Sequence, residues 1–385
     1  MKRVDMKRIA ASVIGVVIGM VIATASPASA APSWRVVAPV AGAQYGHLAS
    51  VSCATAASCF AVGVADTPTT TNRLTERWNG TKWTALTTPS PPTAVASQFT
   101  SVHCRTSSSC VAVGQYTTAA LHTKTMTERW NGASWSLIGS PNPIGIAVTG
   151  LAGVHCTSAT FCIAVGSYFM NSPDSSAEKT LVEQWNGQTW KIIASPNHSG
   201  NTDNGLSGVS CTSATNCTAV GHWSNDLATR TLVERWNGTK WSIVVSPSPA
   251  GVAQSELTGV TCLSASSCFA VGSGHGTLIE RWNGSAWSMM TSPNPTGSNG
   301  ASLTSISCPS ATRCVAVGDF FRSASVTRLA EVWNGASWSI ITTPAPAGTI
   351  LSSFTGVTCA GVANCFAVGE YRLGTSRRPL IERFS

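Results

Sequence analysis

The feature that most constrains this chain is a pair of cysteines that recurs seven times. All 14 cysteines belong to C-x5-C strings, and the second cysteine of each pair opens the string C-x-A-V-G. Successive first cysteines are 51, 52, 55, 51, 46 and 51 residues apart. A period near fifty residues indicates a repeat architecture. Such an architecture suits a chain of 385 residues, because a single hydrophobic core rarely grows to that length.

A second string, E-x-W-N-G-x-x-W, follows in six of the seven units. It occupies residues 76–83, 128–135, 183–190, 234–241, 280–287 and 331–338. In the fifth unit the apolar alternation predicts strands over residues 257–262, 268–272, 277–282 and 287–291. The Asn-Gly pair predicts a tight hairpin turn between the last two strands, and the prolines that follow the fourth strand end it.

Seven four-stranded units predict an all-β fold, a seven-bladed β-propeller. The repeats run near residues 48–95, 99–146, 150–200, 206–251, 257–297, 303–348 and 354–385. The last unit stops after its third strand, and residues 33–39 match the missing fourth strand. We therefore expect the segment at Trp34 to complete the last blade beside residues 380–384, which closes the ring and removes free sheet edges.

The two recurrent strings resemble those of secreted bacterial seven-bladed β-propeller proteins of uncharacterised function. The resemblance covers residues 33–385 and implies the terminal strand exchange of that class. The WD dipeptide, the Gly-Gly doublet of kelch repeats and the Asp-box of sialidases are absent from the sequence. The resemblance therefore implies no active-site residue at any position of this chain.

The first thirty residues are typical of a secretory signal peptide. Basic residues precede an apolar run from Ile9 to Ala25, and Ser26–Ala30 matches a small-residue cleavage site. The alternative is an uncleaved membrane anchor. We expect residues 1–30 to be removed, leaving a single propeller domain over residues 31–385 without a membrane span. The product is predicted to be secreted, with possible cell-wall association, and monomeric.

Export to an oxidising compartment favours a disulfide within each cysteine pair. The alternative, zinc, requires closer spacing and additional ligands, so we expect neither a metal nor a cofactor. Each bridge would cross the hairpin formed by the first two strands. The predicted pairs are Cys53–Cys59, Cys104–Cys110, Cys156–Cys162, Cys211–Cys217, Cys262–Cys268, Cys308–Cys314 and Cys359–Cys365.

Three other recurrent or clustered residue types have a structural and a functional interpretation. The paired tryptophans are expected to pack between blades rather than to form a sugar-binding platform. The glutamate that opens the second string recurs as Glu382 in the last unit, and seven equivalent carboxylates indicate a buried, hydrogen-bonded role rather than catalysis. His103 and His155 precede cysteines in adjacent units, so a two-histidine metal site near the central channel is the functional alternative there.

Function is expected on the face that carries the loops between the second and third strands, because those loops differ from unit to unit. Aromatic and polar residues follow A-V-G there, while the fifth unit has only Ser273-Gly274. They either cap the second strand or bind a carbohydrate or protein ligand. The candidate binding residues are Tyr116, Tyr168, His222, Trp223, Asp319, Phe320, Glu370 and Tyr371.

The leading hypothesis is a secreted, non-catalytic binding protein for a glycan or a protein of the cell envelope. No catalytic set stands out, and a formal net charge of +8 sets no expectation of nucleic acid. The alternative is a propeller enzyme, a glycosidase or lyase acting on extracellular polysaccharide. For that hypothesis the candidate acids are Asp66, Asp226, Asp319 and Glu370. A third hypothesis is a passive surface protein without a defined ligand.

Overall fold

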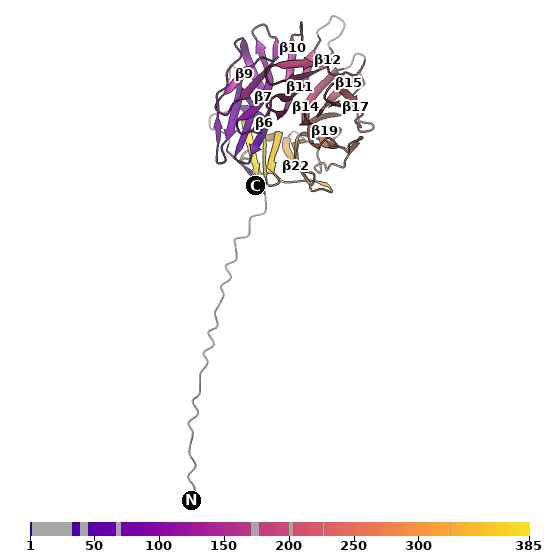
Figure 1. The fold of residues 1–385 in the computed structure, drawn as a ribbon. Helices are drawn as coiled ribbons and strands as arrows, with labels where there is room; N and C mark the ends of the chain where they lie inside the picture. Colours follow the sequence, from indigo (N-terminus) through magenta and orange to yellow (C-terminus); the bar gives the residue numbers. More distant parts are fainter. Residues whose placement is uncertain are drawn as a thin grey trace. The chain divides into compact units, whose positions relative to one another are not determined.

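The part of the chain that the structure describes folds into 28 strands arranged as a seven-bladed propeller (Figure 1). The computed structural model describes Met1 and residues 33–38, 45–66, 71–170, 177–199, 203–225, 227–323 and 325–385. Residues Ser33–Ser385 form one compact unit. Over the described ranges we find no helix with the length and hydropathy that crossing a membrane requires. The predicted signal peptide lies outside the described residues.

Each blade is an antiparallel sheet of four strands in chain order. Blade one contains β2 (Gly46–Thr55), β3 (Ser58–Asp66), β4 (Thr71–Trp78) and β5 (Trp83–Ala85). Blade two contains β6 (Ala94–Thr106), β7 (Ser109–Thr118), β8 (Thr123–Trp130) and β9 (Trp135–Ile138). Blade three contains β10 (Val148–Ser158), β11 (Phe161–Phe169), β12 (Glu178–Trp185) and β13 (Trp190–Ile193). Blade four contains β14 (Asp203–Ser213), β15 (Asn216–Asn225), β16 (Ala228–Trp236) and β17 (Trp241–Val244).

The remaining blades follow the same order. Blade five contains β18 (Glu256–Ser264), β19 (Ser267–Ser273), β20 (Thr277–Trp282) and β21 (Trp287–Met289). Blade six contains β22 (Gly300–Ser310), β23 (Arg313–Arg322), β24 (Ser325–Trp333) and β25 (Trp338–Ile340). Blade seven contains β26 (Leu351–Gly361), β27 (Asn364–Leu373), β28 (Ser376–Phe384) and β1 (Trp34–Val36). First strands begin one to five residues before the predicted repeats, because they continue past the apolar core into polar positions.

The N-terminal strand closes the ring, as the sequence predicts. Trp34 lies opposite Phe384 in the antiparallel register of β1 and β28, and Val36 lies opposite Glu382. The rings of Trp34 and Phe384 are 5.6 Å apart. The backbone N–H of Val37 adds a hydrogen bond to the carbonyl of Ile381, at 2.9 Å. The first and last strands therefore hold each other in one sheet, where β1 takes the outer position that the fourth strand has in the other blades.

The first strand of every blade is the innermost one. Three consecutive residues from each of the seven first strands line a central cavity of about 200 Å³, among them Ser50, Thr100 and Thr258. Their hydroxyls are engaged in joining neighbouring blades. Thr100 donates to the carbonyl of Leu151 at 2.6 Å, and Thr258 donates to that of Leu303 at 2.6 Å. The channel is thus built from satisfied polar groups.

The glycine of A-V-G is required by close approach of the first two strands. In blade five a β-bulge shifts the register between Leu257 and Gly259, and β18 passes tightly over Gly272. A Cβ atom at Gly272 would lie 1.9 Å from the carbonyl oxygen of Glu256. Any side chain there would force the strands apart, which explains why the glycine recurs in every unit.

The core lies between blades and contains the paired tryptophans. Phe60 and Val62 of blade one pack with Trp130 and Trp135 of blade two in one cluster. Tryptophans in these pairs are 2–7% exposed, and their ring centroids are 5.7–5.9 Å apart. The first indole of a pair also donates to the turn between the first two strands, as Trp130 does to the carbonyl of Ser107 at 3.2 Å. The packing interpretation of the tryptophans is therefore the one that the structure supports.

Six of the recurrent glutamates form polar clamps between neighbouring blades, with a serine hydroxyl or an arginine as the partner. Glu183 and Glu280 are fully buried, and each accepts a hydrogen bond of 2.8 Å from a hydroxyl that follows the preceding blade's last strand, Ser140 and Ser246 respectively. Burial raises the pKa of both carboxyls to about 8, and the serine hydrogen bonds only partly oppose this. The buried, hydrogen-bonded role expected of the recurrent glutamates is therefore confirmed for these two, and their carboxyls are largely protonated at neutral pH.

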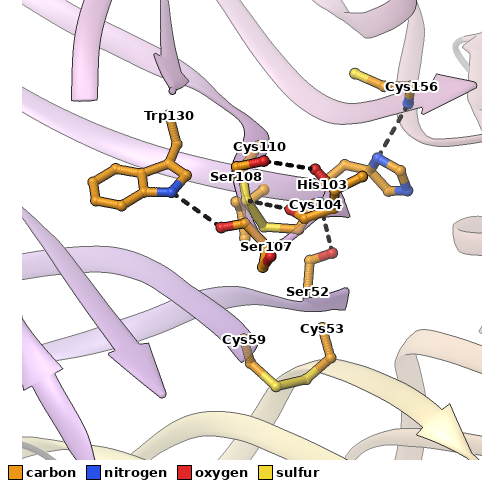
Figure 2. Close-up of a disulfide and its surroundings, with 12 residues drawn as sticks. Ser52, Cys53, Cys59, His103, Cys104, Ser107, Ser108, Cys110, Trp130 and Cys156 are labelled. Atoms are coloured by element: carbon orange, nitrogen blue, oxygen red, sulfur yellow. Dashed lines mark hydrogen bonds between the residues drawn. A yellow bond between two sulfur atoms is a disulfide. The ribbon is translucent and has the colours of Figure 1, made fainter. Parts of the chain in front are cut away.

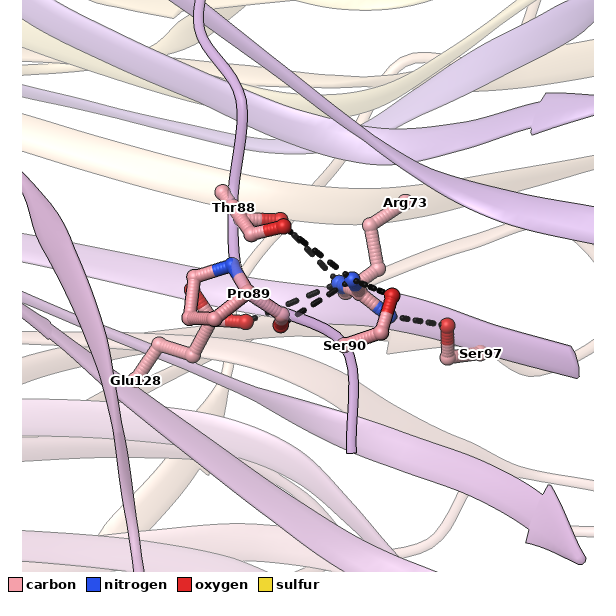
Figure 3. A network of polar contacts seen from close by, with 6 residues as sticks. All are labelled: Arg73, Thr88, Pro89, Ser90, Ser97 and Glu128. Carbon is pink, nitrogen blue, oxygen red and sulfur yellow. Dashed lines mark hydrogen bonds and ion pairs between the residues drawn. The ribbon is translucent and has the colours of Figure 1, made fainter. Parts of the chain in front are cut away.

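Two clamps use arginine instead. After blades one and six, the connection carries Thr88 or Thr343 in place of the serine. In the same two blades, an arginine, Arg73 or Arg328, replaces the threonine found in strand three of blades two to five. The Arg73 Nε lies 3.5 Å from Glu128 Oε1, and the Arg328 Nε lies 2.8 Å from Glu382 Oε1. Figure 3 shows Arg73 reaching Thr88, Pro89, Ser90 and Ser97 as well. The larger, charged side chain thus fills the same junction between blades.

All seven predicted disulfides are formed. Each bridges the first two strands at the hairpin, as Cys104 and Cys110 do in Figure 2. At five junctions the residue before the first cysteine accepts a hydrogen bond from the backbone of the next blade. Ser52 accepts a hydrogen bond from the Cys104 N–H at 2.9 Å, and His103 Nδ1 accepts one from the Cys156 N–H at 3.3 Å (Figure 2).

Candidate functional site

The two faces of the ring carry different connections. One face, called the turn face, holds the disulfide hairpins and the six Asn-Gly turns; in each of these turns the asparagine side chain accepts hydrogen bonds from the backbone two and three residues later, as Asn131 does from Ala133 and Ser134. The opposite face, called the loop face, holds the loops between second and third strands and the connections between blades. The turn face is nearly identical in every blade, so a site specific to one place must lie on the loop face.

Blade five is shortened at the loop face. Its second strand, β19, has 7 residues, whereas the equivalent strands of blades four and six have 10. The chain turns back over Gly274–Gly276, with φ of +69° at His275 and of +156° at Gly276. The N–H of Gly274 donates to the carbonyl of Gly276 at 2.9 Å and closes the turn. The neighbouring blades therefore extend beyond blade five and leave space above it.

Two adjoining cavities occupy that space, and we call them together the blade-five hollow. The larger, about 480 Å³, lies between the blade-four connection at Gly251–Gln254 and blade six at Asn299–Ser302. The smaller, about 300 Å³, is lined by residues of blades three, four and five. Both are lined by Gln254 and Ser273, so they adjoin each other. The hollow has the size of a small-ligand site and a mixed polar and apolar lining.

A histidine–carboxylate pair lies in the smaller cavity. His222 Nε2 is 3.4 Å from Glu178 Oε2, and Asp203 and Glu256 line the same cavity. The backbone N–H of Glu178 donates to Asp203 Oδ1 at 2.9 Å and fixes the start of β12. The cavity therefore presents acceptor oxygens around one imidazole, an arrangement that can accept hydrogen bonds from a ligand.

The electrostatics of this pair favour a charged imidazole. The hydrogen bond to Glu178 raises the pKa of His222, burial opposes it, and the charges of Glu178, Glu256 and Asp203 add to the rise. For Glu178, burial raises the pKa, but hydrogen bonds from His222 and Ser167 outweigh burial and lower it overall. Imidazolium and carboxylate thus stabilise each other at mildly acidic pH.

The eight predicted binding residues lie around the loop face but do not form one cluster. His222 is the member that lines the blade-five hollow. Tyr116, Tyr168, Phe320 and Tyr371 are half-buried, and each packs against the core cluster of its own blade. Tyr168 additionally lines a separate cavity of about 400 Å³ near blade three. Trp223 stacks on His198, with ring centroids 4.2 Å apart.

The predicted acids of blades six and seven are held by local partners. Asp319 accepts a hydrogen bond from the Ser302 hydroxyl at 3.1 Å, and Glu370 pairs with Arg377. Burial raises the pKa of Asp319, and the charge of Glu370 adds to that rise, so these two carboxyls are neighbours. Asp66 accepts a hydrogen bond from Thr71 at 3.2 Å, and Asp226 lies outside the described residues.

Several residues of the hollow were not among the sequence candidates. Glu178, Asp203 and Glu256 carry its charge, and Gln254 joins its two parts. They lie at strand ends and in a blade connection, where no motif marks them. The signal that indicates this place in the sequence is the short spacing of 46 residues in the fifth repeat, together with the bare Ser273-Gly274 after A-V-G.

The histidine pair near the channel serves as a structural contact. The rings of His103 and His155 are 4.1 Å apart. Burial lowers the pKa of His155 to about 4, and burial followed by the neighbouring charges lowers that of His103. Neutral His103 is the state that accepts the Cys156 N–H. Over the described ranges no group of three or more His, Cys, Asp or Glu is placed to hold a metal ion.

Comparison with known proteins identifies the class of fold. No family model and no curated protein sequence matches the chain. Solved propellers do match at low identity. YCF48 bound to D1 peptide is 11% identical with a TM-score of 0.54, covering 91% of this chain and 96% of that one. The WD40 β-propeller domain of Doa1 is 12% identical with a TM-score of 0.51, covering 90% and 96%.

An enzyme shares the same architecture. A PL25 ulvan lyase, bound to -[GlcA(1-4)Rha3S]-, is 8% identical with a TM-score of 0.56, covering 90% of this chain and 95% of that one. At such identities these similarities establish the propeller fold and nothing finer. The chain is thus similar to propellers that differ in what they do.

Proposed function

We propose that this chain is a secreted, non-catalytic binding protein that holds a glycan or peptide ligand in the blade-five hollow. The observation that carries the proposal is the shortened fifth blade, beside which two adjoining cavities lie on the loop face. Export through the predicted signal peptide of residues 1–30 agrees with seven disulfides, since such bonds persist outside the cytosol. The YCF48 and ulvan lyase structures support the idea that this scaffold accommodates peptides or polysaccharides.

The proposal is tested by screening residues 31–385 on glycan and peptide arrays, followed by calorimetry with the best binder. Ser273→Trp places a large side chain in the hollow and is expected to weaken that binder at least tenfold. Ser337→Trp adds the same side chain to an exposed Asn-Gly turn on the turn face and is the matched control. Equal affinity of wild type and Ser273→Trp for every binder found would refute the assignment.

The His222–Glu178 pair supports a second candidate, a polysaccharide-cleaving enzyme acting at the same hollow. A paired imidazole with a raised pKa can act as a general acid or base near neutral pH. The three carboxylates around it would repel an acidic polysaccharide, so a neutral one is the better substrate. New reducing ends or unsaturated products formed by wild type and lost in His222→Asn would favour the enzyme over the binding protein.

A further inference from the structure

Charge is sorted between the two faces of the ring. Two kinds of segment make up the turn face. The first kind is the C-x5-C string of each blade, and the second is the W-N-G-x-x-W string with one added residue at each end. In these described segments there is no Asp or Glu. Six exposed cations lie in them or in the equivalent closing strands, namely Arg35, Lys82, Arg105, Lys191, Lys240 and Arg281. The described acids that keep some exposure instead lie at the loop face, namely Asp66, Glu178, Asp203, Glu256, Asp319 and Glu370.

Further arginines of the turn face are held in place by the next blade. The guanidinium carbon of Arg129 lies 4.9 Å from the ring centroid of Trp185, and that of Arg235 lies 4.4 Å from the ring of Trp282. The guanidinium carbon of Arg383 in blade seven lies 5.5 Å from the ring centroid of Trp78 in blade one. Cation–π contacts thus restrain one arginine at five of the seven junctions, which reduces the conformational entropy lost when an anion binds.

The nearest carboxyls do not cancel this charge. The recurrent glutamates are fully buried in strand three, two residues before the tryptophan. Burial raises the pKa of Glu183, Glu234 and Glu280 to about 8, so these are mostly neutral at pH 7. The turn face therefore acts as a ring of regularly repeated positive charge.

We propose that the turn face docks onto a linear acidic polysaccharide, independently of the ligand in the blade-five hollow. Repeated cations match a polymer with one anionic group per sugar, and charge complementarity steers the encounter. Single-stranded nucleic acid fits less well, because its bases need exposed aromatic platforms and the tryptophans here are buried. An anionic membrane also fits less well, since Val362 is the one exposed large apolar side chain within the described turn segments.

The test measures binding of polygalacturonate to residues 31–385 as a function of salt, with neutral dextran of matched length as reference. We expect binding that weakens steeply with salt and a negligible response to dextran. The triple variant Lys82→Gln/Arg105→Gln/Lys240→Gln is expected to lose at least tenfold in affinity. Each lost contact should also reduce the slope of log K against log salt by about one.

The matched control removes three cations from the loop face: Lys124→Gln/Arg322→Gln/Arg372→Gln. It changes the net charge by the same amount and is expected to alter affinity less than twofold. Thermal unfolding of both variants verifies that they fold. Equal losses in the two triple variants, or no preference for polygalacturonate over dextran, would overturn the proposal. So would tighter binding to single-stranded DNA or to phosphatidylglycerol vesicles than to polygalacturonate.

Discussion

The turn face and the loop face are built from the same seven repeats, yet they differ in what varies. On the turn face every blade repeats a disulfide hairpin and a buried tryptophan, and six of the seven repeat an Asn-Gly turn. On the loop face strand two ranges from 7 residues in blade five to 10 in blades four and six. Groups that stabilise the ring must recur at each junction, whereas the ligand of the blade-five hollow needs one distinct place. Substitutions of the buried groups near the turn face should therefore cost stability, and those lining the hollow should cost binding of its ligand.

The sharpest way to break this comparison is to truncate one aromatic side chain near each face. Trp185 is 2% exposed, donates to the carbonyl of Ala159 at 3.1 Å and lies under Arg129. Trp185→Ala is expected to lower the free energy of unfolding by about 3–5 kcal/mol. Phe321→Ala, at the 46% exposed ring that lines the hollow, should cost less than about 1 kcal/mol. Urea denaturation measures both, and similar losses would contradict the division.

Opening one hairpin disulfide is the next largest effect. The double variant Cys156→Ser/Cys162→Ser frees a short loop in the unfolded chain and is expected to cost about 2 kcal/mol on the chain-entropy model. Denaturation with and without a reductant measures this change. Wild type in reductant should lose more than the double variant does, because six other bridges open as well. A double variant as stable as wild type would show that the turn face needs no covalent support.

The layer of buried glutamates between the two faces should make stability depend on pH. The pKa of Glu183 is raised to about 8 in the folded chain, so its contribution is complete below its unfolded pKa near 4.5. That contribution is lost as pH rises through about 8. Glu183→Gln should reduce the loss of stability between pH 5 and pH 9 by at least about 1 kcal/mol. An unchanged pH profile would mean that this carboxyl is not buried in protonated form.

The smallest expected effect lies at the loop face. The raised pKa of His222 gives a contribution that is present below pH 6.5 and lost as pH rises through the folded value. The lowered pKa of Glu178 gives one that is lost as pH falls through its own folded value. Their pairing should therefore stabilise most between about pH 4.5 and 6.5. His222→Gln should cost about 0.5 kcal/mol there and less at pH 8, as measured by thermal unfolding.

Features that recur could be predicted from the sequence, and features that occur once could not. The alternating strands, the seven disulfides and the closure of the ring by Trp34 follow from spacing repeated many times. The recurrent glutamates were expected to be buried and hydrogen-bonded, and the bond from Ser140 confirms this for Glu183. The exchange of serine for Arg73 or Arg328 at two junctions was not anticipated, because it depends on which residues meet across blades.

The candidate site shows the same limit. Aromatic residues after A-V-G remain candidates for a ligand, although the half-buried Tyr116 and Phe320 pack against core clusters and do not line the blade-five hollow. The blade-five hollow depends on where a shortened loop leaves neighbouring blades extended, which is a property of three blades together. Glu178, Asp203 and Glu256 come from three different strands, and only the ring brings them to one cavity.

Hydrogen exchange of residues 31–385, with and without the tightest binder from the glycan and peptide arrays, tests the central claim most directly. The account predicts slowed exchange in the backbone amides of Gly251–Gln254, Ser273–Gly276 and Asn299–Ser302, with the Asn-Gly turns unchanged. Protection confined to the turn face, or spread equally over all seven blades, would contradict the assignment of ligand binding to the shortened blade.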